Sequence, residues 1–274
     1  MHKDVNGIYT YDDSQKLSTA FTNQVQDDLY DIEDESWWFQ LRARLILSAS
    51  KHFLKKNRLT IDVGGGNGYT TMVMKRAGFR MGLLEPSYKA CIHAKERGID
   101  PVICGSIGRQ EDKWQQCMLL DVLEHIEDDE AFIRALFKEM KPEGRLLITV
   151  PAMKVLWSSE DDEAGHFRRY DRRMLTNVLR KNGFKVIYCS YFYSWLMLPV
   201  FIVRVGMEKL GIIKTTQQRS HEEKLEIEGH QFKQKNKFIN KILTLLNILE
   251  IKAVRKRKSI PFGSSLICLV EKRK

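Results

Sequence analysis

The sequence has few of the residues that cross-link or interrupt a fold. Its five cysteines are scattered and form neither a Cys-x-x-Cys pair nor a cluster with zinc-ligand spacing. This pattern indicates reduced, mostly buried thiols in a cytosolic protein. Only six prolines occur, and 43% of the residues are hydrophobic and 29% charged. That composition excludes a mainly disordered or fibrous chain.

Long apolar runs are also absent. The N-terminal residues MHKDVNGIYTYDDSQ have neither the basic nor the apolar region of a signal peptide. The most apolar stretch, residues 193–203, contains Pro199 and is followed by Arg204, well short of the roughly twenty residues of a spanning helix. We therefore expect a soluble, cytoplasmic protein or one bound at a membrane surface. The formal net charge of +10 favours acidic partners such as phosphates, anionic lipid or nucleic acid, without choosing among them.

From Leu59 onward, short apolar runs alternate with amphipathic stretches of helical length. This alternation is the signature of βαβ units with a parallel sheet buried on both faces. A helix is expected at 173–181, after a long polar segment that lies where open α/β sheets bind ligands. The predicted strands are 59–65, 80–86, 101–106, 116–122, 145–151, 184–192 and 264–274.

The most specific motif is IDVGGGNGYTT, which follows a predicted strand and opens a helix. Gly64, Gly66 and Gly68 allow a tight turn and leave room for a ligand beside the backbone. The following helix N-terminus favours an anionic group. Tyr69 stands where a dinucleotide site would need Gly or Ala, which argues against NAD or FAD. Glu85 ends the next strand, at the distance from which an acidic side chain can accept hydrogen bonds from both ribose hydroxyls.

The glycine loop and Glu85 carry a family resemblance together with further segments of the chain. These segments are LLDVLEHIEDD (119–129), KPEGRLLITVP (141–151) and, more loosely, residues 166–184. The chain resembles class I S-adenosylmethionine-dependent methyltransferases of the broad UbiG-like or type 11 group. The resemblance covers most of the chain and says little about the methyl acceptor.

The resemblance implies S-adenosylmethionine as cofactor and S-adenosylhomocysteine as product. Ser106 and Ile107 stand where many relatives carry an Asp that contacts the adenine, so a backbone or hydroxyl contact is expected there. In WWFQLR, Trp38 or Phe39 could cover the cofactor and Arg42 could pair with its carboxylate, although such aromatic residues are more often core. The remaining cofactor residues that the resemblance implies are Asp62, Gly64, Gly66, Gly68, Glu85 and Asp121.

We therefore predict an α/β, Rossmann-like, doubly wound domain with a seven-stranded sheet whose last strand is antiparallel. The first sixty residues are expected to be helical. Four segments are assigned: an N-terminal helical cover (1–58), the cofactor-binding core (59–192), a helical insertion (193–262) and the final strand (263–274).

The acceptor hydroxyl needs a base, because methyl transfer is an in-line displacement that releases the hydroxyl proton. His166, in the long polar segment, is the predicted base. Its neighbours Arg168, Arg169 and Tyr170 could grip a carboxylate or phosphate of the acceptor. The alternative is a solvated loop whose residues form a salt bridge to Asp161, Asp162 or Glu163.

His125 is the competing residue. Asp121, Glu124 and His125 could converge on a divalent ion, and some quinone O-methyltransferases that resemble this group bind metal through similarly spaced residues. Three ligands on one turn seldom make a full site, whereas His125 packing at a helix start and Glu124 capping it explains the same residues. We predict that the site holds no metal.

Two apolar helices, 195–213 and 238–254, are predicted before the last strand. An apolar face beside a basic cluster suits anionic lipid and hence a lipid-linked acceptor. A cap over the site or a homodimer interface explains the apolar runs without lipid, and is favoured slightly. Nucleic acid is an unfavoured partner because no base-methylation tetrapeptide or RNA-binding module is present. The basic cluster comprises Lys252, Arg255, Lys256, Arg257 and Lys258.

The predicted function is methyl transfer to an oxygen, less readily a nitrogen, of a small-molecule, sugar or lipid-linked acceptor. The alternative is a non-catalytic cofactor-binding protein on the same scaffold. The intact glycine loop, Glu85 and Asp121 count against that alternative.

Overall fold

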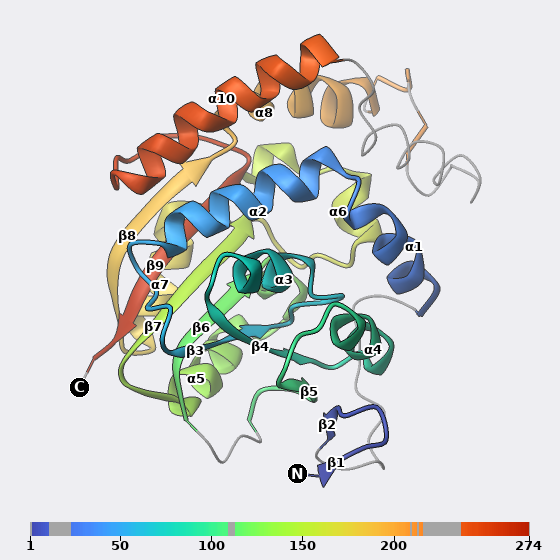
Figure 1. Ribbon diagram of the computed structural model, residues 1–274. Coiled ribbons are helices and arrows are strands. Elements are labelled where there is room, and N and C mark those ends of the chain that lie inside the picture. The colour runs from blue at the N-terminus through green and yellow to red at the C-terminus, as the bar shows by residue number, and fades with distance from the viewer. Residues whose placement is uncertain are drawn as a thin grey trace.

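The computed structural model describes residues 2–10, 23–108, 113–208, 210–212, 214–215 and 237–273, with only the backbone given for Arg204 and residues 237–244 (Figure 1). Its strands form one mixed sheet in the order β1-β2-β5-β4-β3-β6-β7-β9-β8. The last strand, β9, runs antiparallel between β7 and β8, as predicted. The strands are β1 (His2–Lys3), β2 (Tyr9–Thr10), β3 (Leu59–Val63), β4 (Arg80–Glu85), β5 (Val102–Cys104), β6 (Trp114–Leu120), β7 (Met140–Pro151), β8 (Phe184–Phe192) and β9 (Ser265–Lys272).

Seven of these strands form the predicted sheet, and the first two are an addition. The expectation that the first sixty residues are helical was wrong at residues 2–10, where β1 and β2 pair as a hairpin. The Asp4 carboxylate accepts hydrogen bonds from the N–H groups of Asn6 and Ile8, which closes the turn. Ile8 is fully buried. The hairpin thus extends the edge at β5, to which β2 pairs in parallel.

Helices cover both faces of the sheet, so the domain is doubly wound (Figure 1). In β7, Leu146 and Ile148 pack with α5 and α7, whereas Leu147 between them packs with α2, α3 and α10. This two-residue alternation follows from the strand pleat. The helices here are α2 (Trp37–Ser50), α3 (Tyr69–Arg76), α5 (Asp129–Glu139), α7 (Arg172–Lys181) and α10 (Lys237–Arg255).

The remaining helices lie at the sheet's edge and at the ends of its strands (Figure 1). Ser36 and Asp171 cap α2 and α7 by accepting backbone N–H groups, which fixes where these two helices begin. Two short 3-10 turns, Leu123–His125 and Lys154–Leu156, follow β6 and β7. The other helices are α1 (Asn23–Glu33), α4 (Tyr88–Glu96), α6 (Ser159–Glu163) and α8 (Ser194–Val200).

Where the structure describes it, the insertion before β9 is largely helical, as predicted. Its second helix, α10, matches the expected range closely, but the first divides into α8 and a π-helix, η3 (Phe201–Met207). Pro199 inside α8 lacks an N–H group, which removes one α-helical hydrogen bond just before the hydrogen-bond pattern changes. Residues 216–236, between the two predicted helices, lie outside the described residues. No helix in the described part of the chain is long and apolar enough to cross a membrane.

Candidate active site

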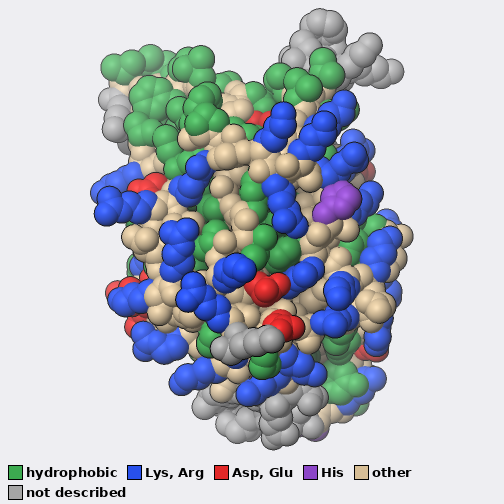
Figure 2. Space-filling model, turned by 90° about the vertical axis from the view of Figure 1, so that its left-hand side faces the viewer, with side chains coloured by type: hydrophobic (Ala, Val, Ile, Leu, Met, Phe, Trp, Pro, Cys, Tyr) green, Lys and Arg blue, Asp and Glu red, His purple; other side chains and the backbone are tan. Residues whose placement is uncertain are grey.

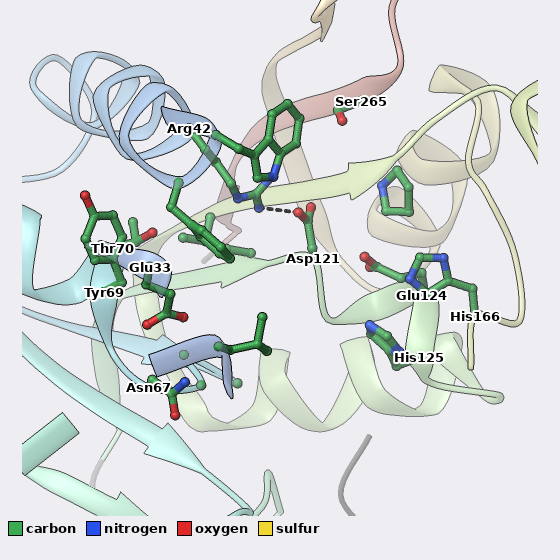
Figure 3. Close-up of a pocket in the computed structure, with 18 of the residues that line it drawn as sticks. Glu33, Arg42, Asn67, Tyr69, Thr70, Asp121, Glu124, His125, His166 and Ser265 are labelled. Atoms are coloured by element: carbon green, nitrogen blue, oxygen red, sulfur yellow. Dashed lines mark ion pairs between the residues drawn. The ribbon is translucent and has the colours of Figure 1, made fainter. Parts of the chain in front are cut away.

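A pocket of about 510 Å³ lies beyond the carboxyl ends of β3, β6 and β7 (Figure 3). Helices α1, α2 and α8 also contribute to its walls. The volume is in the range of small-molecule sites, and the position is the one at which open α/β sheets bind ligands. The predicted site residues that line it are Arg42, Asp62, Gly64, Gly66, Asp121, His166 and Arg169.

The glycine loop between β3 and α3 needs its glycines for different reasons. Gly64, Gly66 and Gly68 all have positive φ, at 70°, 53° and 78°. A Cβ at Gly64 would lie 2.6 Å from Val122 Cγ2, and one at Gly68 would collide with Ile99. A Cβ at Gly66 would meet no atom within 4 Å. Gly66 therefore leaves open space on the pocket side, whereas Gly68 allows Ile99 to pack closely against the loop.

Glu85 holds the glycine loop from the end of β4. Its Oε2 accepts the Gly66 N–H at 3.0 Å, and its Oε1 accepts the Ser87 N–H at 2.9 Å. Burial raises the pKa of Glu85, and these two hydrogen bonds partly offset that increase. Glu85 does not line the pocket, so its contact with a ribose stays a prediction.

Asp62, on β3, is buried and borders the pocket. Its Oδ2 accepts a hydrogen bond from Thr71 Oγ1 at 2.5 Å, whereas Oδ1 has no partner among the described residues. Burial raises the pKa of Asp62 to about 7, and the charge of Glu85 adds to the increase. Asp62 therefore offers a buried oxygen, without a hydrogen bond, beside the glycine loop.

Arg42 and Asp121 meet across the pocket (Figure 3). Arg42 Nη2 lies 2.5 Å from Asp121 Oδ2 and donates to Thr149 Oγ1 at 2.8 Å. The Thr149 hydroxyl donates in turn to Asp121 Oδ1 at 3.0 Å. Burial lowers the pKa of Arg42, but the charge and hydrogen bond of Asp121, together with the charges of Tyr193 and Glu124, outweigh burial and raise the pKa. Arg42 thus pairs with Asp121, and its predicted contact with a cofactor carboxylate stays a prediction.

Asp161 holds the two pocket residues of the polar segment. Its Oδ1 accepts from His166 Nδ1 at 2.8 Å and from Arg169 Nε at 2.8 Å. Burial would raise the pKa of Asp161, but the hydrogen bonds from His166 and Arg169 outweigh it and lower the pKa. The salt bridge of the alternative interpretation therefore exists, and His166 borders the pocket as well. A carboxylate on Nδ1 favours the imidazole tautomer that leaves Nε2 basic.

Glu124, His125 and His166 lie together beside Asp121 (Figure 3). One ligand atom of each lies within 4.8 Å of the others, so these three residues could hold a metal ion. Burial and the charge of Asp121 raise the pKa of Glu124. Burial and the charge of His166 lower the pKa of His125 to about 4. The metal ligands considered from the sequence were Asp121, Glu124 and His125, whereas this cluster contains His166 in place of Asp121. That the site holds no metal stays a prediction.

Trp38 and Phe39, which were predicted to cover the cofactor, line the pocket as well. Arg168 and Tyr170 lie outside its wall. Tyr170 is fully buried, and its hydroxyl donates to Asp129 Oδ2 at 2.7 Å. Arg168 donates to the carbonyl oxygens of Ile126 and Glu127. These contacts fix the polar segment to the turn after β6, which positions His166. Gly68, Ser106 and Ile107 also do not line the pocket.

Thr149, which joins Arg42 to Asp121, was not among the predicted site residues. The available signal was a hydroxyl within the otherwise apolar strand RLLITVP. Such a buried hydroxyl needs a hydrogen-bond partner, and the partners here come from two other segments.

Comparison with known families decides the class of this protein. A family model described as a methyltransferase domain matches residues 35–188, which is more than half of the chain. The chain belongs to the methyltransferase domain family. This membership confirms the predicted class I family and S-adenosylmethionine as its cofactor, while the UbiG-like subgroup stays a prediction. No curated protein sequence matches the chain.

Solved structures of similar fold differ in activity. The [4+2]-cyclase SpnF is similar with a TM-score of 0.60 at 16% identity, covering 92% of this chain and 93% of its own. Haemonchus contortus phosphoethanolamine N-methyltransferase 2, solved with S-adenosylmethionine, has a TM-score of 0.54 at 15% identity, covering 93% and 58%. The plantazolicin methyltransferase BamL, solved with S-adenosylhomocysteine, has a TM-score of 0.52 at 12% identity, covering 92% and 91%. This likeness shows the fold, and the acceptor must be argued from the site.

Proposed function

We propose that this methyltransferase transfers a methyl group from S-adenosylmethionine to a hydroxyl oxygen of a small acceptor, with His166 as general base. The observation that carries the proposal is that the Asp161–His166 pair and the glycine loop border the same pocket. A hydroxyl acceptor is the case that needs such a base, because its proton must leave as the new bond forms.

The chain's residues fit the cofactor. The open space at Gly66 and the Asp62 oxygen without a hydrogen bond lie at one end of the pocket, where Asp62, Gly64 and Gly66 would hold the methionine part. Glu85, directly behind the loop, would hold the ribose. When bound, the cofactor supplies an electrophilic methyl group on a sulfonium.

On the acceptor side, Asp161 keeps the Nδ1 proton of His166 and orients the ring, so that Nε2 takes the acceptor proton. Arg169, held by the same carboxylate, places a cation at the pocket wall, where it would bind an anionic group of the acceptor.

The cofactor part is tested by calorimetric titration with S-adenosylhomocysteine, with NAD as comparison. Micromolar binding that is lost in Glu85→Ala, which releases the glycine loop, and absent for NAD is the expected result. A folded protein that binds neither would favour the non-catalytic scaffold.

The base is tested by the rate of S-adenosylhomocysteine formation with candidate acceptors. His166→Ala should lower the rate by about two to four orders of magnitude and leave S-adenosylhomocysteine affinity unchanged. The exposed His52, replaced by Ala, is the matched control. An unchanged rate in His166→Ala would show that another group, or proximity alone, does the work.

A further inference from the structure

In the part whose side chains are described, residues 245–255, helix α10 packs against the domain through one face. Asn247, Glu250 and Val254 are buried on that face. The Glu250 carboxylate accepts the backbone N–H groups of Tyr193 and Ser194 at 2.6 and 2.7 Å, which joins α10 to the start of α8. The other face of α10 is therefore held in a fixed orientation toward the outside.

The outward face of α10 changes from apolar to basic along the helix. Leu245, Ile248 and Leu249 are 58%, 39% and 57% exposed, and no acidic residue follows between 251 and 270. The basic residues that follow are all exposed: Lys252, Arg255, Lys256, Arg257 and Lys258. An apolar stripe continued by cations is the pattern of a helix that lies in a membrane interface.

The helix beside it continues the apolar surface and also reaches the pocket. In α8, Leu196 and Val200 line the pocket, whereas Leu198 is 66% exposed and, in η3, Ile202 is 50% exposed. No charged residue occurs from 194 to 203. Figure 2 shows hydrophobic side chains gathered at the top of the molecule, where α8 and α10 lie, with Lys and Arg side chains below them.

We propose that this docking face, made of Leu198, Ile202, Leu245, Ile248, Leu249 and the basic cluster, binds an anionic lipid membrane. A bilayer with anionic headgroups complements both parts, because it offers apolar chains and negative charge side by side. Since α8 has its other side in the pocket wall, the acceptor enters from the bilayer as a lipid-borne hydroxyl compound. The acceptor part rests on the proposed function, whereas the membrane contact does not.

Co-sedimentation of the full chain with vesicles tests the contact. Binding is expected to vesicles of phosphatidylcholine with phosphatidylglycerol, to weaken as salt rises, and to be much weaker for pure phosphatidylcholine. The triple variant Lys256→Ala, Arg257→Ala, Lys258→Ala should weaken binding by about a hundredfold, because each cation contributes separately. Leu198→Ser with Ile202→Ser should weaken it by about tenfold or more.

A matched triple variant, Lys138→Ala, Lys141→Ala and Lys185→Ala, removes the same charge from exposed residues near the amino ends of β7 and β8, far from α8 (Figure 1). Its affinity for vesicles should stay within about twofold of that of the parent, because salt screens charges that lie far from the docking face. Equal losses in both triples, or no binding by the parent, would overturn the proposal. A dimer in solution that is cross-linked through Leu198→Cys, and that persists when vesicles are added, would also overturn the proposal. Titration with S-adenosylhomocysteine on the same variants separates the two proposals, because vesicle binding without cofactor binding would contradict only the proposed function.

Discussion

Arg42, on the helix that covers the sheet, and Asp121, at the end of β6, form an ion pair with an Nη2–Oδ2 distance of 2.5 Å. Asp121 is a non-glycine residue with φ of 53°, and the Thr149 hydroxyl bonds both partners. The pair lies at the point where the strand order reverses between β3 and β6. It therefore joins the N-terminal cover to the sheet at the pocket itself.

Removing both partners of this pair should cost less stability than the sum of the two single changes. Asp121→Ala leaves the Arg42 side chain, which is only 9% exposed, without its counterion, and we expect a loss of about 2 kcal/mol in the free energy of unfolding. The value is smaller than the roughly 3–5 kcal/mol for breaking a fully buried ion pair, because the Asp121 side chain is 35% exposed. In urea unfolding, Asp121→Ala combined with Arg42→Met should cost about 1 kcal/mol less than the sum of the two single changes. Strict additivity would contradict the pairing.

The contact between Asp161 and His166 predicts that a substitution at Asp161 lowers the turnover rate. Asp161→Asn presents an amide N–H to His166 Nδ1 and favours the tautomer with the proton on Nε2, so turnover should fall by about a hundredfold or more. The exposed Asp162, whose Oδ1 accepts from Trp157 Nε1, is the matched control. Asp162→Asn should keep turnover within about threefold. Equal turnover rates in the two variants would show that Asp161 does not contribute to catalysis.

Most strands could be predicted because a sheet buried on both faces gives continuous apolar runs ended by turn residues. The strand β8 was predicted with its observed bounds, and α7 within one residue. The β1–β2 hairpin could not be predicted, because its strands have two residues each and their pairing depends on the distant β5. The change to a π-helix at Phe201 leaves no periodicity by which to recognise it.

In the candidate site, too, contacts between residues close in sequence could be predicted and contacts between distant segments could not. His166 and Asp161 are five residues apart, so their contact follows from the local turn, and the sequence already suggested it. The contact among Arg42, Asp121 and Thr149 joins three distant segments. No spacing in one sequence encodes such a meeting, although each residue is polar within an apolar surrounding.

A pH dependence follows from Asp62. Burial raises its pKa to about 7 in the folded protein. A raised folded pKa means that its contribution to stability is present below the unfolded pKa near 4 and is lost as the pH rises through about 7. Asp62→Asn cannot ionise and keeps an acceptor for Thr71, so at pH 8 it should be more stable than the parent by about 1–3 kcal/mol.

This difference is measured by urea unfolding of parent and variant at several pH values from 4 to 8. At pH 4 the advantage of Asp62→Asn should shrink to about 0.5 kcal/mol, because the parent carboxyl is then neutral in the folded state and about half protonated in the unfolded state. Asp162→Asn, at an exposed position, should run parallel to the parent. Parallel curves for parent and Asp62→Asn would show that Asp62 does not titrate in this window.

Chelation tests whether Glu124, His125 and His166 act without a metal ion. Burial and the charge of Asp121 raise the pKa of Glu124, and this weakens the carboxyl as a metal ligand, because metal binding needs its deprotonated form. Asp161 occupies His166 Nδ1. Turnover should therefore stay the same after dialysis against EDTA, and Glu124→Gln, which is neutral and of the same shape, should keep the rate within a few-fold. A loss of about tenfold or more that Mg²⁺ or Zn²⁺ restores in the parent, but not in Glu124→Gln, would instead make the three residues metal ligands.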